Sequence, residues 1–193
     1  HVFGELSSHE QTSNNTLYFS LVPKKNVDQQ IDELQPLLQL LEEQLGIPIK
    51  IIRPQSYYSV IEGILSQTID FAIMGPASYA KARARDERIE AFASFAKEKG
   101  LITPRGSFYS SVLFTLRDFG HDSIEDLKGK KVALTDPSST SGSVIPNIFF
   151  TKDIGSSLKD FFSSQVYTGS HDRSIKVVQQ NYVDAAFVSS VRI

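Results

Sequence analysis

The hydroxyl side chains of Ser139, Thr140 and Ser141 stand in a row, after a turn that begins at Asp136 and directly before Gly142. A strand, a turn and a helix that begins among hydroxyls bring unpaired backbone N–H groups and rotatable O–H donors to one spot. Such a spot suits a tetrahedral oxyanion, because the N-terminus of a helix also carries partial positive charge. Serine, threonine and aspartate are equally the ordinary residues of a helix N-cap. From this segment alone, an oxyanion site and a plain helix cap both stay open.

The composition narrows the classes of function. The chain has 193 residues, of which 40% are hydrophobic and 22% charged, the balance of a globular protein with one substantial core or two small lobes. A net charge of −2 gives no support for binding to nucleic acid or to an anionic membrane. An anion must therefore be bound by local donors. The sequence has no cysteine, which excludes thiolate chemistry, and it has no P-loop and no metal-ligand spacing, so we expect neither a metal nor a cofactor.

The N-terminal residues 1–15 are polar, and we expect a flexible N-terminus there rather than a signal peptide. No apolar run approaches the roughly 20 residues that span a bilayer. Whether a signal peptide is removed on export stays open.

Strands and helices are expected to alternate along the first half of the chain. Apolar periodicity predicts strands over 16–22, 47–52 and 69–74, and helices over 27–45, 56–66 and 77–88. This order is typical of a parallel sheet covered by helices. The first helix is expected to stop at Gly46, and Pro36 inside it to kink it or to mark a restart.

A second α/β unit is expected from about residue 92. Strands are predicted over 91–96, 110–116, 131–135, 165–168 and 184–189, and helices over 123–127, 144–151 and 174–181. Ligands of open α/β sheets bind beyond the carboxyl ends of the strands. Four clusters follow predicted strands in this way: Tyr57–Tyr58, Gly75–Ser78, Ser139–Ser141 and Gly169–Asp172. Four strand ends that meet at one cleft favour ligand binding over a lone helix cap.

One string carries a specific resemblance. Residues 136–142 read DPSSTSG, and Gly169-Ser170-His171-Asp172 follows farther along the chain. Together they resemble the periplasmic phosphonate-, phosphite- and phosphate-binding proteins of ABC importers. Weaker matches occur around Tyr57, over 70–76, around Tyr109 and over 124–132, so the resemblance runs in order from about Thr16 to Ser189.

The resemblance implies an α/β protein with the two-lobed type II periplasmic-binding (Venus-flytrap) fold, truncated at the C-terminus. We expect lobe 1 over 16–91, incomplete because its return segment is missing, and lobe 2 over 92–190. Residues 191–193 are expected to begin the crossover back to lobe 1.

The resemblance also implies a ligand-binding site without catalytic or metal-binding residues. The hydroxyls of Ser139, Thr140 and Ser141 would hold the oxyanion, His171 would donate to it, and Tyr57 and Tyr109 would close over it. Hydroxyl and imidazole donors match the three or four acceptor oxygens of such an anion. Val191 stands where relatives that take aminoalkylphosphonates carry an acidic residue, which disfavours a ligand with an amine.

The implied function is the capture of a phosphorus oxyanion for an ABC permease, without catalysis, in the periplasm or outside the cell. Anchoring to the membrane through a removed N-terminal signal stays open. The alternative from another class is the sensor domain of a membrane receptor, where the same fold would report its ligand to a signalling module. A hydrolase that uses Ser139 or Ser141 with His171 and Asp172 is disfavoured, because there is no G-x-S-x-G elbow and neighbouring side chains diverge.

Overall fold

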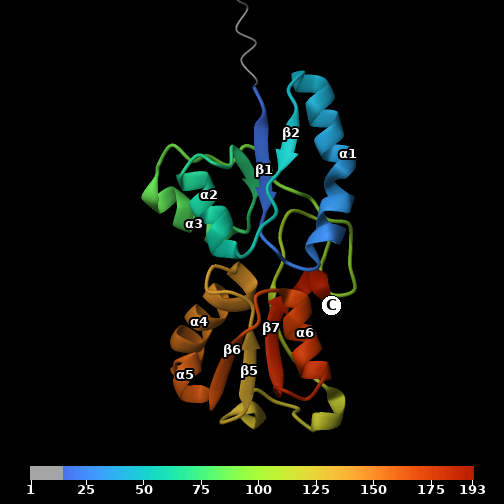
Figure 1. The fold of residues 1–193 in the computed structure, drawn as a ribbon. Helices are drawn as coiled ribbons and strands as arrows, with labels where there is room; N and C mark the ends of the chain where they lie inside the picture. The colour runs from blue at the N-terminus through green and yellow to red at the C-terminus, as the bar shows by residue number, and fades with distance from the viewer. Residues whose placement is uncertain (1–14) are drawn as a thin grey trace, which may run out of the picture.

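Two sheets organise the chain, and each is the centre of one lobe (Figure 1). The computed structural model describes residues 15–193, so the predicted flexible N-terminus, apart from residue 15, lies outside the described residues. The first sheet has the strand order β2-β1-β3 and the second the order β4-β7-β5-β6. No helix within residues 15–193 has the length and the apolar character needed to cross a bilayer.

The first lobe is a parallel sheet with helices on both faces (Figure 1). Its strands are β1 (Leu17–Leu21), β2 (Ile49–Ile51) and β3 (Phe71–Ile73), and its helices are α1 (Val27–Leu45), α2 (Tyr57–Leu65) and α3 (Pro76–Arg85). Phe19 and Leu21 of β1 pack against Leu38 of α1. On the other face, Val22 packs with Tyr57 and Val60 of α2. The predicted alternation of strands and helices is confirmed in this lobe.

Helix α1 has the bounds that its sequence predicts, because both ends are determined locally. The side chain of Asn26 accepts a hydrogen bond from the backbone N–H of Gln29, and Gly46 closes the other end with φ 65°. Pro36 lies inside a continuous helix, so the expected restart at Pro36 is wrong.

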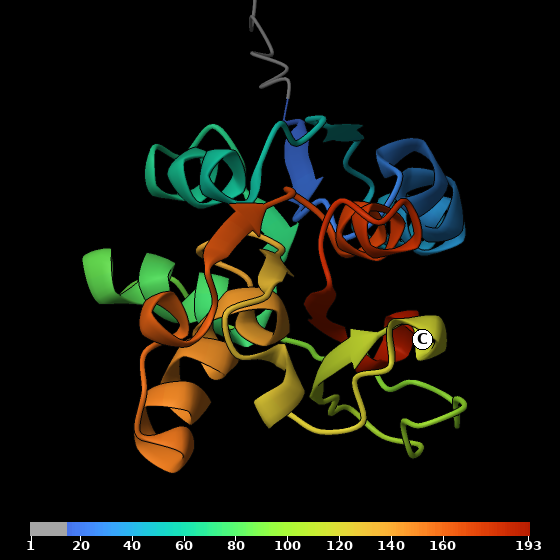
Figure 2. The same ribbon diagram turned by 90° about the horizontal axis from the view of Figure 1, so that it is seen from below.

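The second lobe is a mixed sheet. Strand β5 (Lys131–Leu134) runs parallel to β6 (Ser164–Tyr167) and to β7 (Ala185–Ser189), whereas β4 (Ser111–Thr115) runs antiparallel to β7. Seen from below, α6 (His171–Gln179) lies on one side of this sheet, and α4 (Ile145–Phe149) and α5 (Leu158–Phe161) lie on the other (Figure 2). The π-helical segments η3 (Thr140–Val144) and η4 (Phe150–Ile154) flank α4. Three short 3-10 turns complete the lobe: η1 (Arg117–Phe119), η2 (Glu125–Leu127) and η5 (Ser190–Arg192).

Each face of the second sheet has its own core. Val132 and Leu134 of β5 pack into a cluster that contains Phe150, whereas Ala133 packs with Val178 of α6 on the opposite face. This alternation is the period of two expected for a strand. The hydroxyl run at residues 139–141 follows the carboxyl end of this strand.

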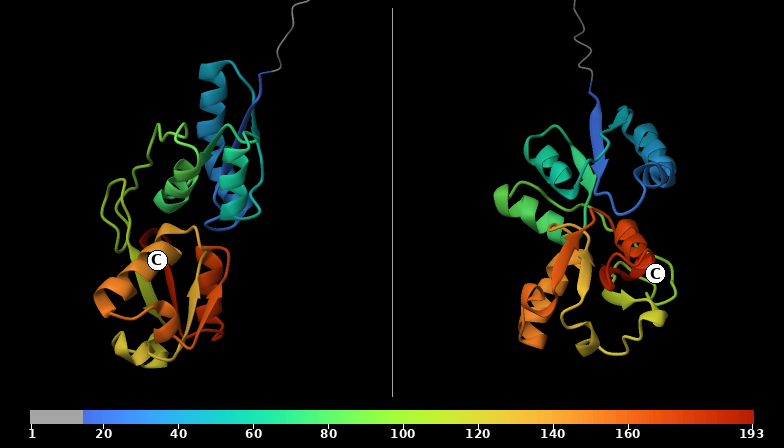
Figure 3. Two further views of the ribbon diagram at one scale, coloured as in Figure 1. Left: turned by 90° about the vertical axis from the view of Figure 1, so that its left-hand side faces the viewer. Right: turned by 60° about the horizontal axis from the view of Figure 1, so that its bottom comes forward.

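The strand predicted over 91–96 does not form. Residues 86–110 form an irregular connection from the first lobe to the second (Figure 3). It folds back on itself, where Lys97 and Gly106 form an isolated antiparallel bridge. A strand requires a neighbouring strand to pair with its backbone groups. Residues 91–96 have none within the described chain, and Phe92 is 79% exposed. Here the local apolar run has no sheet edge to join.

Two helices begin earlier than their sequences predict. The helical run expected to start at Val144 begins at Thr140 with Ser139 as its N-cap, and the helix expected to start at Ser174 begins at His171 with Ser170 as its N-cap. His171 therefore occupies the first turn of α6 instead of a loop. Both corrections follow from serine caps that precede the apolar periodicity.

Candidate functional site

The hydroxyl run lies at the start of η3, directly beyond the carboxyl end of β5. Residues 139–142 are called the cradle below. Ser139 and Ser141 are buried, with 1% and 2% of their surfaces exposed, and Ser139 Oγ accepts a hydrogen bond from the Gly142 N–H at 3.1 Å. A Cβ at Gly142 would lie 2.1 Å from Thr135 Oγ1, so only glycine fits there. Ser139 is thus a helix cap. A π-helical turn, which is rare and frequent at functional sites, widens the backbone here.

The cradle contacts the first lobe through the N-terminus of α3. The Ala77 N–H donates to Thr140 Oγ1 at 2.9 Å, and Ser78 Oγ donates to the Ser138 carbonyl at 2.9 Å. Lys81 Nζ donates to the Pro137 carbonyl at 2.6 Å. The positive end of α3 therefore points at the cradle from the opposite lobe.

The two predicted tyrosines approach the cradle from different segments. Tyr57 is buried in the core of the first lobe, and this burial raises its pKa, whereas a hydrogen bond with the Ser139 side chain acts in the opposite direction. Burial also raises the pKa of Tyr109, whereas a hydrogen bond with Thr140 lowers it. A Cβ at Gly75 would lie 3.1 Å from Thr140 Oγ1 and 3.3 Å from the Tyr109 hydroxyl. Both phenols therefore stay protonated at neutral pH, and each keeps an O–H group.

His171 lies in the first turn of α6 and is 3% exposed. Its Nδ1 accepts a hydrogen bond from the Ser189 N–H at 3.3 Å and lies 3.1 Å from Thr135 Oγ1. Because Nδ1 is an acceptor, the proton of the neutral ring is assigned to Nε2. The backbone N–H of His171 donates to the Lys24 carbonyl at 3.0 Å, which ties α6 to the first lobe.

The protonation of His171 leads to a prediction about stability and pH. Burial lowers the pKa of His171 to about 4, the charges of Lys24 and Arg192 act in the same direction, and Asp172 opposes them. The folded-state pKa therefore lies below the unfolded value of about 6.5. The contribution of the neutral His171 side chain to the free energy of unfolding is therefore complete above pH 6.5. It is lost as the pH falls towards 4, because the unfolded state takes up the proton first, by at most about 1.4 kcal/mol per pH unit.

Urea unfolding of the protein and of His171→Gln, measured at several pH values from 7 to 4, checks this prediction. We expect the wild type to lose stability more steeply than the variant in this window, because glutamine has no proton to gain. Equal slopes for the two proteins would show that His171 titrates with its ordinary pKa.

The structure brings the six predicted residues to one region, with Thr135 between the cradle and His171. It does not assemble a Ser–His–Asp relay. The Asp172 carboxylate accepts from Arg192 Nη2 at 2.7 Å, and His171 Nδ1 is engaged by Ser189.

Two polar groups of the candidate site were not predicted from the sequence. The Ala77 N–H is a backbone donor, which no side-chain type reveals, although its cluster at the end of a predicted strand was the available signal. Ser189, at the carboxyl end of β7, is buried, and its Oγ has no hydrogen-bond partner within residues 15–193. Its position at the end of the last predicted strand was the signal for it.

Cavities occur at two other places in the described chain. One of about 190 Å³ is lined by Ser20 and Ser59, and one of about 450 Å³ lies where Tyr58 and Lys81 meet Ser138, beside the contact between the lobes. Neither is lined by the cradle, by the two predicted tyrosines or by His171. In the cradle, the Thr140 hydroxyl meets the opposite lobe directly, with Ala77 as its partner.

Comparison with known proteins identifies the family. A family model described as "ABC transporter, phosphonate, periplasmic substrate-binding protein" matches residues 19–192. The chain belongs to this family. It is 25% identical over 183 residues to the phosphonates-binding periplasmic protein of Escherichia coli, covering 93% of this chain and 52% of that protein. It is also 25% identical over 177 residues to the phosphate-import protein PhnD of Mycolicibacterium smegmatis, covering 89% and 54%.

Solved structures support the fold of the phosphonate-binding family. PhnD1 from Prochlorococcus marinus, solved in complex with methylphosphonate, is similar with a TM-score of 0.74 at 21% identity, over 91% of this chain and 64% of that one. A binding protein of an ABC phosphonate transporter from Pseudomonas aeruginosa also gives 0.74, at 22% identity, over 91% and 57%. The predicted type II periplasmic-binding fold is thereby confirmed. The chain spans about half the length of the curated relatives named above.

Proposed function

We propose that this protein is an extracytoplasmic solute-binding protein that captures a phosphorus oxyanion (a phosphonate, phosphite or phosphate) for an ABC permease. The observation that carries the proposal is the buried cradle at residues 139–142, which meets the N-terminus of α3 from the other lobe. The match to a transport component supports this role over a sensor domain. The proposal includes a periplasmic or extracellular location, with membrane anchoring as an option. It also includes lobes over 16–91 and 92–190 and a crossover that begins at 191–193.

The chemistry of the site fits a phosphorus oxyanion. Such an anion presents three or four acceptor oxygens, and the donors are the hydroxyls of the cradle, the phenols of Tyr57 and Tyr109 and the Nε2–H of His171. All these groups are neutral, consistent with a chain whose net charge is −2. Contact between the lobes removes water and strengthens each hydrogen bond. In this proposal the site binds its ligand and does not transform it.

Isothermal titration calorimetry against phosphite, phosphate, methylphosphonate and 2-aminoethylphosphonate tests the proposal. We expect at least one of the first three to bind, and 2-aminoethylphosphonate to bind more weakly than methylphosphonate because Val191 has no charge to offer an ammonium group. Absence of heat with all four ligands in a folded sample would refute the ligand class.

Single hydroxyl deletions in the cradle should weaken binding. Ser139→Ala and Thr140→Ala are each expected to cost about 1–3 kcal/mol of binding free energy, the range for a lost hydrogen bond to a charged group. The matched control is Ser157→Ala. Ser157 caps α5 by accepting from the Asp160 N–H, as Ser139 caps η3, but it lies outside the cradle. The control should lose stability without losing affinity, and full affinity in both cradle variants would reduce the hydroxyls to helix caps.

A further inference from the structure

Lys24 is a cation in an unusual position. It follows β1 in the loop before α1, and its carbonyl accepts the backbone N–H of His171 at 3.0 Å. The residue is partly buried, yet no carboxylate lies within ion-pair distance of its ammonium group inside the described chain. Burial lowers the pKa of Lys24, and Lys97, Arg192 and Lys25 act in the same direction. A desolvated cation among other cations is destabilising unless an anion joins it.

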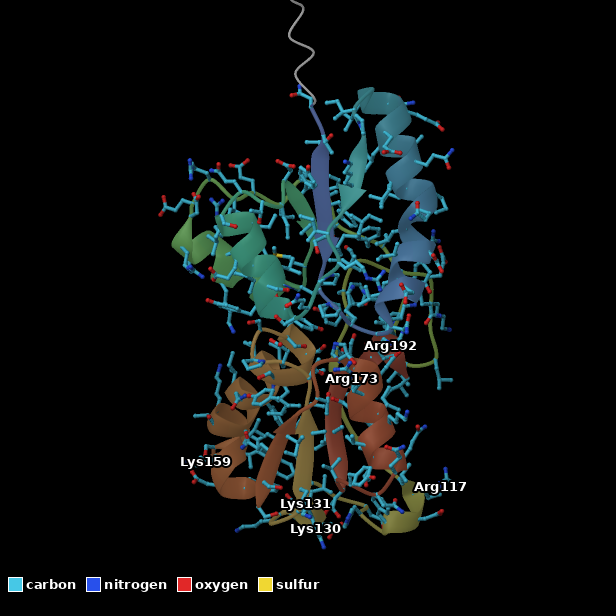
Figure 4. The ribbon with its side chains drawn as sticks, in the orientation of Figure 1. Arg117, Lys130, Lys131, Lys159, Arg173 and Arg192 are labelled. Atoms are coloured by element: carbon cyan, nitrogen blue, oxygen red, sulfur yellow. The ribbon has the colours of Figure 1, made fainter. Side chains whose placement is uncertain are left out.

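The neighbouring charges leave a local excess of positive charge. Lys97 comes from the irregular connection between the lobes, and Arg192 lies in η5 at the lobe junction (Figure 4). Lys24, Lys97 and Arg192 are called the cation cluster below. Two carboxylates lie nearby, and each is already engaged: Asp172 accepts from Arg192 at 2.7 Å, and Glu33 pairs with Lys25. The charges of Lys24 and Lys97 are therefore not compensated within the described residues.

The cation cluster is separate from four basic residues of the second lobe. Figure 4 shows Arg117, Lys130, Lys131 and Lys159 at the far end of that lobe, away from the junction, whereas Arg192 and Arg173 lie beside it. Positive charge at the junction is thus a local feature in a chain with a net charge of −2.

His171 connects the cation cluster with the cradle. Its side chain reaches Thr135, against which Gly142 packs, and its backbone N–H donates to the Lys24 carbonyl. The positive charges of Lys24 and Arg192 also act on its ring, so both cations lie close to it. A ligand seated in the cradle and extending past His171 would therefore meet Lys24.

Ser189 supplies an independent sign of a ligand in this region. It pairs directly with Ser111 across β7 and β4, so the two side chains share one face of the sheet. Ser111 Oγ donates to the Ser141 carbonyl at 2.6 Å, which identifies this face as the one that meets the cradle. The Ser189 hydroxyl is buried there without a partner in the described chain, a costly state that a ligand group relieves.

We propose that the ligand carries a second anionic group, separated from the phosphorus oxyanion by a short chain, and that the cation cluster binds this group. This inference rests on the proposed function and narrows its substrate class to phosphonates with a terminal anion, such as a carboxylate. Lys24 is the residue that determines this specificity.

Calorimetry with three matched phosphonates tests the inference: 3-phosphonopropionate has a terminal carboxylate, propylphosphonate has similar length and no terminal charge, and 2-aminoethylphosphonate has a terminal cation. We expect the wild type to bind 3-phosphonopropionate roughly tenfold or more tightly than propylphosphonate, and 2-aminoethylphosphonate most weakly. Lys24→Gln should bring the first ratio close to one, because it removes the charge that the terminal carboxylate would pair with. Lys97→Gln should reduce the ratio in part. Because the Lys97 side chain is exposed, this substitution should not impair folding.

The control variant is Lys159→Gln, because Lys159 lies at the far end of the second lobe (Figure 4) and should keep the wild-type ratio. Equal affinities of the wild type for 3-phosphonopropionate and propylphosphonate would overturn the inference and leave the proposed function intact. A preference that survives in both Lys24→Gln and Lys97→Gln would also overturn it. Failure of every phosphonate, of phosphite and of phosphate to bind would instead refute the proposed function.

Discussion

Gly142→Ala is expected to weaken oxyanion binding severely. The added Cβ would lie 2.1 Å from Thr135 Oγ1, 2.4 Å from Thr135 Cβ and 3.0 Å from Ser139 Oγ. Thr135 has little room to withdraw, because its backbone N–H donates to the Gly142 carbonyl at 3.0 Å and its hydroxyl lies 3.1 Å from His171 Nδ1. The clash must displace the cradle backbone itself. We expect affinity to fall at least roughly 100-fold, equivalent to about 2.7 kcal/mol.

The control for this variant separates crowding from loss of the site. Gly63→Ala would place a Cβ 2.2 Å from Ile69 Cδ1 in the first lobe, away from the cradle. Both variants should lose roughly 1–3 kcal/mol of stability from overpacking. Gly63→Ala should lose less, because the end of the Ile69 side chain moves more easily than Thr135 Cβ, which is bonded directly to the backbone. Calorimetry and urea unfolding of the two proteins decide the matter. Wild-type affinity in Gly142→Ala would mean that the ligand does not use the cradle.

The parts of the fold that the sequence predicts well depend on local signals. Helix α1 begins after Asn26 and ends at Gly46 because a side-chain cap and a left-handed glycine act within one turn. The prediction of a strand over 91–96 is wrong for the opposite reason, since the apolar residues of this segment do not indicate whether a sheet edge is near. Pairing of strands is a long-range property, and no window of sequence contains it.

The same distinction between local and long-range signals applies to the candidate site. The hydroxyl run is visible because its residue types and its place after a strand coincide. The contact between Ala77 and Thr140 joins residues 63 positions apart, through a backbone donor that every residue but proline possesses. The uncompensated charge of Lys24 is likewise a product of folding, because Lys97 and Arg192 approach it only in three dimensions.

The largest loss of stability is expected for Phe150→Ala. Phe150 is fully buried, and its ring centroid lies 5.0 Å from that of Phe161, 5.5 Å from that of Phe162 and 5.9 Å from that of Phe187. Removal of a fully buried phenylalanine costs about 3–5 kcal/mol, through lost burial and the cavity left behind. Phe149→Ala is the matched control, because the adjacent ring is exposed and should cost far less. Similar unfolding midpoints in urea for the two variants would contradict this assignment of the core.

The same variant tests how the core and the site depend on one another. Phe150 packs against β5 and β7, the strands whose carboxyl ends lead to the cradle and to Ser189, and the hydrophobic cluster around it contains neither Tyr57 nor Tyr109. We therefore expect Phe150→Ala to lower the population of folded protein while leaving the affinity of the folded fraction unchanged. A saturating oxyanion should then raise the stability of variant and wild type by the same amount, as mass action requires when the dissociation constant is equal. A smaller increase in the variant would show that the aromatic cluster also holds the cradle in its binding geometry.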